Sequence, residues 1–192
     1  STTRRTDGGW SVPTPIKNNH QVSSSSTREE CLSADRRVMI ASRQIDGATI
    51  GNKDLYVSFR QDDGSYGPLI NLGTAVNTAS GDGAPFLAAD GRTLYFASDD
   101  GGYGNTDMYV TKRLDDTWLN WSPRINLGPT INTPFWDCYF TIHPSGKYAY
   151  LNTSNGDKDG IYRISLPQDK ASRTLLPDPV VIITGTVYHA RT

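Results

Sequence analysis

An all-β fold built from repeated four-stranded units is predicted by three observations. Blocks of sequence return about every 55 residues along the 192-residue chain. Gly (18) and Pro (11) are plentiful, and Tyr (10) outnumbers Phe (5), which is typical of a turn-rich β protein. Apolar residues occur in short runs bounded by turn residues, without the 3.6-residue spacing of amphipathic helices.

Three separate blocks share the same period. With their later copies they are residues 32–42 (87–98 and 142–151), 51–57 (104–110 and, degraded, 159–162) and 70–73 (125–128). Agreement of three blocks on one spacing is not expected by chance. We therefore infer that one supersecondary unit repeats along the chain.

Each period contains four strand-like runs. In the best copy they are residues 84–88, 93–98, 107–113 and about 118–127. Asp90-Gly91 predicts a hairpin turn, because glycine takes a positive φ at little cost, and residues 114–116 close the next hairpin. Four short strands in such a period are the signature of a β-propeller blade. The predicted fold is thus about three four-stranded antiparallel propeller blades.

The predicted blades are bounded by turn-rich segments. They span residues 29–73, 83–128 and 138–176, within a propeller region of residues 1–177. An outer strand at 9–16 precedes them, because Trp10 and Pro13 resemble Trp121 and Pro123 ahead of a later outer strand. Residues 178–192 are expected to form a linker and the first strand of a following domain.

A closed propeller needs at least four blades, so three blades leave the ring open. We favour a fragment of a larger propeller. Two alternatives remain: an open ring whose third blade is completed by the strand at 9–16, and two copies that meet as a six-bladed ring. Open blade edges also predict self-association.

Charge and hydropathy exclude several classes of protein. The net charge of −1 gives no electrostatic footprint for nucleic acid or an anionic membrane surface. No run approaches the ~20 apolar residues of a membrane helix, so the chain is not expected to be transmembrane. No signal peptide is visible, and an exported protein would carry it outside this sequence. Cys31 and Cys138 occupy non-equivalent repeat positions, so a framework disulfide is not expected.

The three blocks together closely resemble TolB-like, WD-type propeller repeats. In particular, residues 10–167 are similar to the propellers of OmpA-family, peptidoglycan-associated outer-membrane proteins of the Bacteroidetes type. This resemblance implies a periplasmic, outer-membrane-associated protein. It also implies that residues 183–190 open a carboxypeptidase-regulatory-like β-sandwich.

The chain departs from the family pattern at several positions. Arg36 replaces the turn glycine of the first blade, and Ser145 replaces the turn aspartate of the third. The third blade also lacks a clean Gly-Asn-x-Asp block. The OmpA-like domain is not in this sequence, so no peptidoglycan-binding residue can be transferred.

Long connections are predicted on one face of the blades, at residues 43–53, 73–82, 99–106 and 128–137. Binding residues concentrate on long loops carried by a rigid scaffold. The candidate binding residues on this face are Asp99, Asp100, Tyr103, Asn105, Phe135, Trp136 and Asp137.

These candidates have competing interpretations. The oxygens of residues 99–107 could hold Ca²⁺, but we favour a turn in which Asn105 and Asp107 bind loop amides, with no metal or cofactor. Trp136 could bind a sugar or a protein, or pack over the adjoining blade. Trp118 and Trp121 are expected to pack between blades.

No catalytic constellation is visible. His20, His143 and His189 are scattered without metal-ligand spacing, and neither cysteine is expected to pair with a histidine as a catalytic nucleophile and base. We therefore expect a non-catalytic scaffold that binds another envelope protein. One alternative is a lectin-like propeller that binds a glycan. A second is a propeller glycosidase or lyase, which would need facing carboxylates from Asp82, Asp99 and Asp137.

Overall fold

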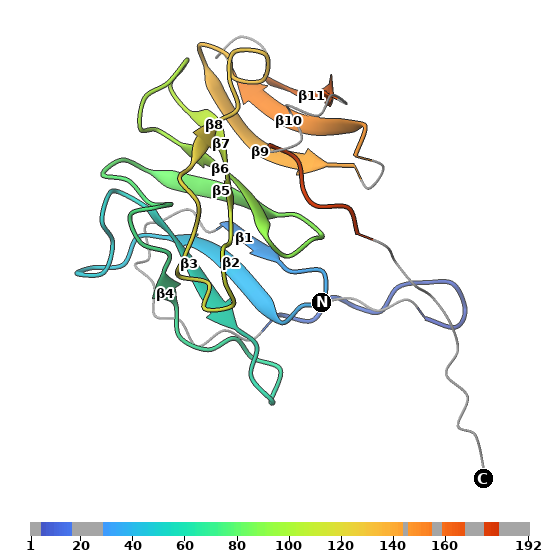
Figure 1. The fold of residues 1–192 in the computed structure, drawn as a ribbon. Helices are drawn as coiled ribbons and strands as arrows, with labels where there is room; N and C mark the ends of the chain where they lie inside the picture. Colours follow the sequence, from blue (N-terminus) through green and yellow to red (C-terminus); the bar gives the residue numbers. More distant parts are fainter. Residues whose placement is uncertain (1–4, 17–28, 144–145, 155–158, 168–174, 181–192) are drawn as a thin grey trace.

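A computed structural model describes residues 5–16, 29–143, 146–154, 159–167 and 175–180. Eleven strands in these residues form three antiparallel sheets, which confirms the predicted all-β class. The sheet of β5–β8 lies between the other two (Figure 1). Across the described part of the chain, no helix has the length and apolar character needed to span a membrane.

Sheets one and two have the same strand order. Sheet one consists of β1 (Glu29–Leu32), β2 (Val38–Arg43), β3 (Asp54–Phe59) and β4 (Ile70–Asn71). Sheet two consists of β5 (Asp82–Leu87), β6 (Thr93–Ser98), β7 (Asp107–Lys112) and β8 (Ile125–Asn126). Sheet three consists of β9 (Trp136–Ile142), β10 (Tyr148–Ser154) and β11 (Asp159–Ser165), in the order β11-β10-β9.

One position in the turn between the first two strands has a positive φ in all three sheets. Gly91 has a φ of 64°, and Arg36 and Gly146 have φ values of 59° and 65° at the corresponding positions. The Asp90 carboxylate accepts hydrogen bonds from the amides of Arg92 and Thr93, both at 2.9 Å. The hairpin predicted at Asp90-Gly91 is therefore confirmed, and Arg36 occupies a left-handed conformation that favours glycine.

The hairpin predicted at residues 114–116 is wider than expected. The Leu114 amide donates to the Asn120 carbonyl at 2.9 Å, so the loop encloses residues 115–119. The Asp115 carboxylate stabilises this longer loop by accepting hydrogen bonds from Thr117 and Asn120. The prediction of a three-residue closure was wrong, because these local side-chain bonds favour a wider turn.

Apolar side chains of sheet two alternate between its two faces. On β6, Leu94 and Phe96 enter a cluster shared with sheet one, whereas Tyr95 and Ala97 enter a cluster shared with sheet three. Both faces are therefore buried against neighbouring sheets. Each fully buried aliphatic or aromatic side chain contributes roughly 1.5–3 kcal/mol relative to an exposed one. Stacking of sheets is thus the main source of stability in this region.

Trp118 and Trp121 pack as predicted. Both belong to the cluster between sheets one and two, and their ring centroids are 6.1 Å apart. The Trp121 indole donates to the Trp118 carbonyl at 2.8 Å, so its one polar group is satisfied.

Sheet three differs from the prediction, because it has three strands in the described residues. Leu175 and Leu176, assigned from the sequence to the end of the third blade, pack instead against the cluster between sheets two and three. On β11 the side chains of Ile161 and Tyr162 are exposed. Leu175 and Leu176 therefore pack toward sheet two and do not form a fourth strand beside β11.

The remaining predicted elements lie at the ends of the chain. Residues 5–16 belong to none of the three sheets, although an outer strand was expected at 9–16, and Trp10 is exposed. Ser145 and the strand expected within residues 183–190 fall outside the described residues, as do His20 and His189.

Candidate functional site

The long loops of sheets one and two are held by the same polar network. In sheet two, the Asp107 carboxylate accepts hydrogen bonds from the amides of Tyr103 (2.7 Å) and Gly104 (3.1 Å) and from the Asn126 side chain (2.7 Å). The Asn132 side chain in turn bonds both backbone groups of Met108. The predicted bracing role of Asp107 is therefore confirmed.

Sheet one repeats this arrangement bond for bond. Asp54 accepts from the amides of Ile50 (2.7 Å) and Gly51 (3.2 Å) and from the Asn71 side chain (2.7 Å). Asn77 bonds both backbone groups of Leu55. We call these two sets, Asp54/Asn71/Asn77 and Asp107/Asn126/Asn132, the loop braces.

The glycine of the repeated Gly-Asn pair is required by close packing of two loops. A Cβ on Gly104 would lie 2.3 Å from the Thr133 carbonyl, and one on Gly51 would lie 2.1 Å from the Ser80 carbonyl. Next to this contact the Asn105 amide donates to the Phe135 carbonyl at 3.0 Å. The loop at 99–106 thus lies directly against the loop at 128–137.

Other polar candidates in this region are already engaged. Asp99 accepts a hydrogen bond from the Thr106 hydroxyl at 2.5 Å, and Asp100 forms an ion pair with Arg124. In the described residues, no group of three or more His, Cys, Asp and Glu side chains is placed to hold a metal ion. The acidic side chains of this loop therefore act as local hydrogen-bond acceptors.

The carboxylates of Asp82 and Asp137 are fully buried. Asp137 accepts hydrogen bonds from the backbone and hydroxyl of Thr133, and Asp82 accepts one from the Thr78 amide at 2.7 Å. Burial raises the pKa of Asp82 above its ordinary value. Neither carboxylate is exposed to solvent.

Aromatic side chains remain exposed on this otherwise braced surface. The exposed fractions of Tyr103, Phe135 and Trp136 are 50%, 41% and 54%. Trp136 begins β9, where it pairs with Ser154 and bridges to Thr106 of sheet two. Its backbone is therefore fixed between two sheets while its ring faces solvent.

A second group of side chains, which the sequence did not single out, lies where the first strands of the three sheets, β1, β5 and β9, approach one another. Glu29 on β1 accepts hydrogen bonds from the Ala84 amide of β5 (2.8 Å) and the Tyr139 hydroxyl of β9 (3.1 Å). It also pairs with Lys53 at 3.1 Å. One carboxylate thus connects all three sheets, and we call Glu29, Lys53 and Tyr139 the inner cluster.

The environment of Glu29 favours its ionised form. Burial raises the pKa of this carboxyl, since only 13% of the side chain is exposed, but the Ala84 amide, Lys53 and Tyr139 outweigh burial. The net pKa therefore lies below the ordinary value of 4.5. Glu29 also raises the pKa of the Tyr139 phenol through its negative charge.

The inner cluster occupies positions at which the repeats differ. Glu29, Ala84 and Tyr139 are spaced 55 residues apart, and Ala84 and Tyr139 both have a positive φ, each on a first strand (β5 or β9) whose pairing has a register shift. Trp136 stands where sheet two has Gly81. This difference between aligned repeats is the signal that could have identified Glu29 and Tyr139 in advance.

Both cysteines are free. The Cys31 thiol accepts a hydrogen bond from the Leu87 amide at 3.2 Å, and burial raises its pKa. Burial, assisted by the negative charges of Glu29 and Asp137, raises the pKa of Cys138 to about 11. Both thiols are therefore protonated near neutral pH and weakly reactive.

Comparison with known proteins identifies no family. No protein-family model matches the chain, and no curated protein matches it.

Proposed function

We propose that the three sheets are consecutive blades of a β-propeller, with β1, β5 and β9 as innermost strands. The 55-residue period, the common strand order of sheets one and two, and the adjacency of β1 to β5 and of β5 to β9 support this assignment. The parallel bridges from Lys53 to Gly81 and from Thr106 to Trp136 support it further, because each joins one sheet to the next at an equivalent place.

We propose that this propeller is a non-catalytic docking module for another cell-envelope protein. The observation that carries the proposal is the set of exposed aromatic rings on a braced loop surface. A rigid backbone lowers the entropy lost on binding, and aromatic side chains dominate the energetics of protein interfaces. Tyr103, Phe135 and Trp136 form the proposed docking surface, together with the adjoining exposed polar residues Asp99, Asp100 and Asn105. Asp137 was also a candidate, but it is buried and can only support this surface from beneath.

The resemblance of the repeats to those of OmpA-family proteins gives this module its proposed setting. We place it in the periplasm, associated with the outer membrane, where a propeller of this type would hold a partner near peptidoglycan. The near-neutral charge fits a role in which shape and aromatic contact, more than charge attraction, select the partner.

Affinity capture with matched variants tests the docking surface. The chain is immobilised and exposed to an envelope extract of a Bacteroidetes bacterium, beside Phe135→Ala/Trp136→Ala and the control Trp10→Ala. Trp10 is a suitable control because it is exposed and lies outside the three sheets. We expect a partner to be retained by the parent and by Trp10→Ala, and lost by the double variant. Equal retention by all three, or by none, contradicts the proposal.

Glycan binding is a second candidate function. It is favoured by Trp136 and Tyr139, which are both exposed on β9, and by the Glu29 carboxylate, to which the Tyr139 hydroxyl donates a hydrogen bond. Aromatic rings can stack on the apolar face of a sugar, and a carboxylate can accept its hydroxyl protons. A glycan array separates the two functions: glycan binding that is lost in Trp136→Ala supports this one, and a silent array removes it.

A further inference from the structure

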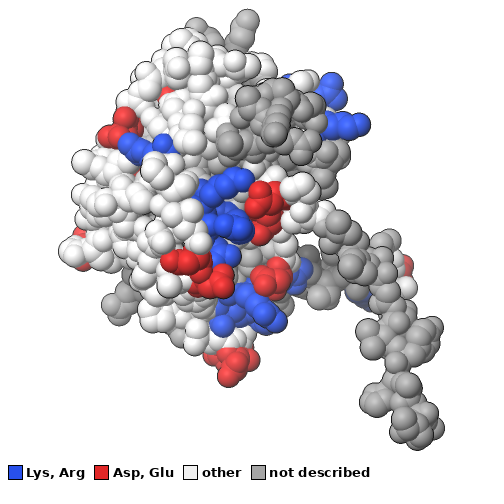
Figure 2. Space-filling view, in the orientation of Figure 1, with Lys and Arg blue, Asp and Glu red and all other residues white. Residues whose placement is uncertain are grey.

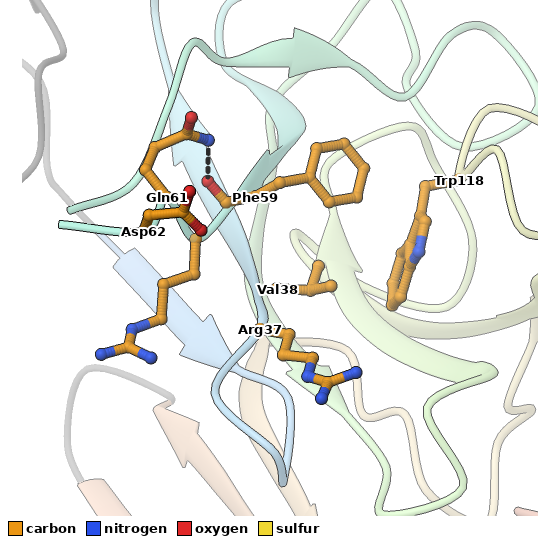
Figure 3. Close-up of a pocket in the computed structure, with 7 residues that line it drawn as sticks. Arg37, Val38, Phe59, Gln61, Asp62 and Trp118 are labelled. Atoms are coloured by element: carbon orange, nitrogen blue, oxygen red, sulfur yellow. Dashed lines mark hydrogen bonds between the residues drawn. The ribbon is translucent and has the colours of Figure 1, made fainter. Parts of the chain in front are cut away.

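A groove opens between sheets one and two at the end of the strands opposite the proposed docking surface. Its volume is about 530 Å³. Val38 begins β2 and Phe59 ends β3, so the groove lies beside the short turns, whereas the long loops follow the other ends of these strands. Figure 3 shows Val38, Phe59 and Trp118 pointing toward one another, which gives the groove an apolar interior.

The rim of the groove is polar, with a small excess of positive charge. Arg37 and Arg60 supply two guanidinium groups, and Asp62 supplies one carboxylate. Arg37 also lies 3.8 Å from Asp35, at a highly exposed position where such pairs contribute little. On the face shown in Figure 2, basic and acidic side chains are interspersed.

The corresponding place between sheets two and three shows what fits such a groove. In sheet one Val38 pairs with Phe59 across β2 and β3, and in sheet two Thr93 pairs with Lys112 at the same register. Beside Thr93 and Lys112, however, the surface is covered by residues 175–178 of the chain itself.

Three polar contacts fix this covering segment. The Tyr95 hydroxyl donates to the Leu175 carbonyl at 2.6 Å, and the Asp178 amide donates to the Asp90 carboxylate at 2.8 Å. The Asp178 carboxylate pairs with Lys112 at 3.2 Å. Leu175 and Leu176 add apolar contact with the adjacent core cluster. The segment therefore docks by an aliphatic pair followed by an acidic residue.

The open groove has a larger apolar surface, and its cationic groups are guanidinium groups at the rim instead of the Lys112 ammonium that pairs with Asp178. Val38 and Phe59 replace Thr93 and Lys112, while Arg37 and Arg60 correspond in the repeat to Arg92 and Arg113. We propose that this groove binds an extended segment of a partner protein in which aliphatic side chains are followed within a few residues by Asp or Glu. The aliphatic groups contact Phe59 and Trp118, and the carboxylate pairs with Arg37 or Arg60.

A peptide with the sequence of residues 175–180, blocked at both ends, is the probe. Its binding to the ¹⁵N-labelled chain is followed by NMR through the amides of Val38 and Arg60 and the Trp118 indole. We expect saturable shifts of these signals with a Kd of roughly 1 mM, as suits a short peptide with few contacts. Replacing the peptide's acidic residue by Asn is expected to weaken binding about fivefold, and replacing both leucines by Ala is expected to abolish it.

Charge reversal on the protein provides the matched test. Arg37→Glu/Arg60→Glu should weaken binding at least fivefold, and Arg92→Glu, the same change at the repeat-equivalent position outside the groove, should leave the Kd unchanged. Unaltered signals from sheet three report that each variant is folded. Shifts confined to Tyr95, Asp90 and Lys112 would mean that the peptide only displaces residues 175–178. That result, or no shift at several millimolar peptide, overturns the proposal for this groove. It leaves the separate proposal of a docking surface at Tyr103, Phe135 and Trp136 unaffected.

Discussion

Sheets one and two have the same loop framework but different residues where they meet their neighbours. The loop braces of the two sheets make the same bonds, with the leading amide of each loop 2.7 Å from Asp54 or from Asp107. Where neighbouring sheets meet, by contrast, sheet one carries Glu29 on its first strand and Lys53 just before its third, and sheet two carries Ala84 and Thr106 at these positions.

This difference separates two kinds of constraint on a repeated sequence. A brace must satisfy the same buried backbone groups in every copy, so its residues recur. A position at which neighbouring sheets meet has different surroundings in each copy, so its residue can differ. Recurring polar residues therefore indicate framework in this chain, and polar residues that break the repeat indicate candidate sites.

Removing a brace is expected to cause the largest loss of stability, and to the same extent in both sheets. Asp107→Ala deletes three hydrogen bonds to a buried carboxylate, which we expect to lower the free energy of unfolding by about 3 kcal/mol. Asp54→Ala should cost the same within ~1 kcal/mol, by the shared geometry. Urea unfolding of both variants measures this. A loss of stability in only one of the two variants would contradict the equivalence of the two loop braces.

Arg43 tests the inner region of sheet one, where the repeat is broken. Its side chain is 1% exposed and forms an ion pair with Glu30, whereas Ser98 stands at the equivalent position in sheet two. Arg43→Ala should lower the free energy of unfolding by about 2 kcal/mol through lost packing and an unpaired Glu30. Ser98→Ala should cost about half as much or less. Equal costs in thermal or urea unfolding would contradict the distinction.

We expect Glu29 to make the free energy of unfolding depend on pH. Sheet two has no such contribution, because it carries Ala84 at the equivalent position. Its folded pKa is lowered, so its stabilising contribution is present above the ordinary value of 4.5 and is lost as the pH falls through the lower folded pKa. In Glu29→Gln the free energy of unfolding should be lower near pH 7 by about 1 kcal/mol. The difference between the two proteins should shrink between pH 5 and the acid transition. A difference independent of pH would exclude the ionised inner cluster.

The smallest expected effect is a gain of stability in sheet one. Arg36 has a φ of 59° where sheets two and three have glycine, and a left-handed residue other than glycine costs roughly 1–2 kcal/mol. Glycine loses more backbone entropy on folding, by about 0.5–1 kcal/mol, so Arg36→Gly should stabilise by about 0.5 kcal/mol net. Gly91→Ala is the reciprocal change and should destabilise. Calorimetry of both variants gives the sign.

The sequence predicted those parts of the fold that depend on local chemistry. The turn at Asp90-Gly91 and the bracing role of Asp107 follow from residue types recurring at one spacing, and the burial of Trp118 follows from its place beside the predicted outer strand. The wide loop at 114–120 was missed because it depends on one carboxylate, that of Asp115, finding several local donors.

Contacts between repeats were harder to predict. Glu29 meets Tyr139 across 110 residues of chain, and Leu175 packs against sheet two instead of completing sheet three. Both depend on how the sheets stack. Of the predicted site residues, the structure brings Asn105 against Phe135, leaves Tyr103 and Trp136 exposed, and buries Asp137.

The convergence of the three inner strands is tested most directly by the proximity of Tyr139 to Glu29 in solution. Nuclear Overhauser spectroscopy on a sample with selectively labelled tyrosine and glutamate should give a cross-peak between the Tyr139 ring and the Glu29 side chain, since their oxygens are 3.1 Å apart. We predict this cross-peak at neutral pH, together with one from Glu29 to the Ala84 amide. Absence of both, in a sample that retains the cross-peaks within sheets one and three, would contradict an arrangement in which β1, β5 and β9 meet.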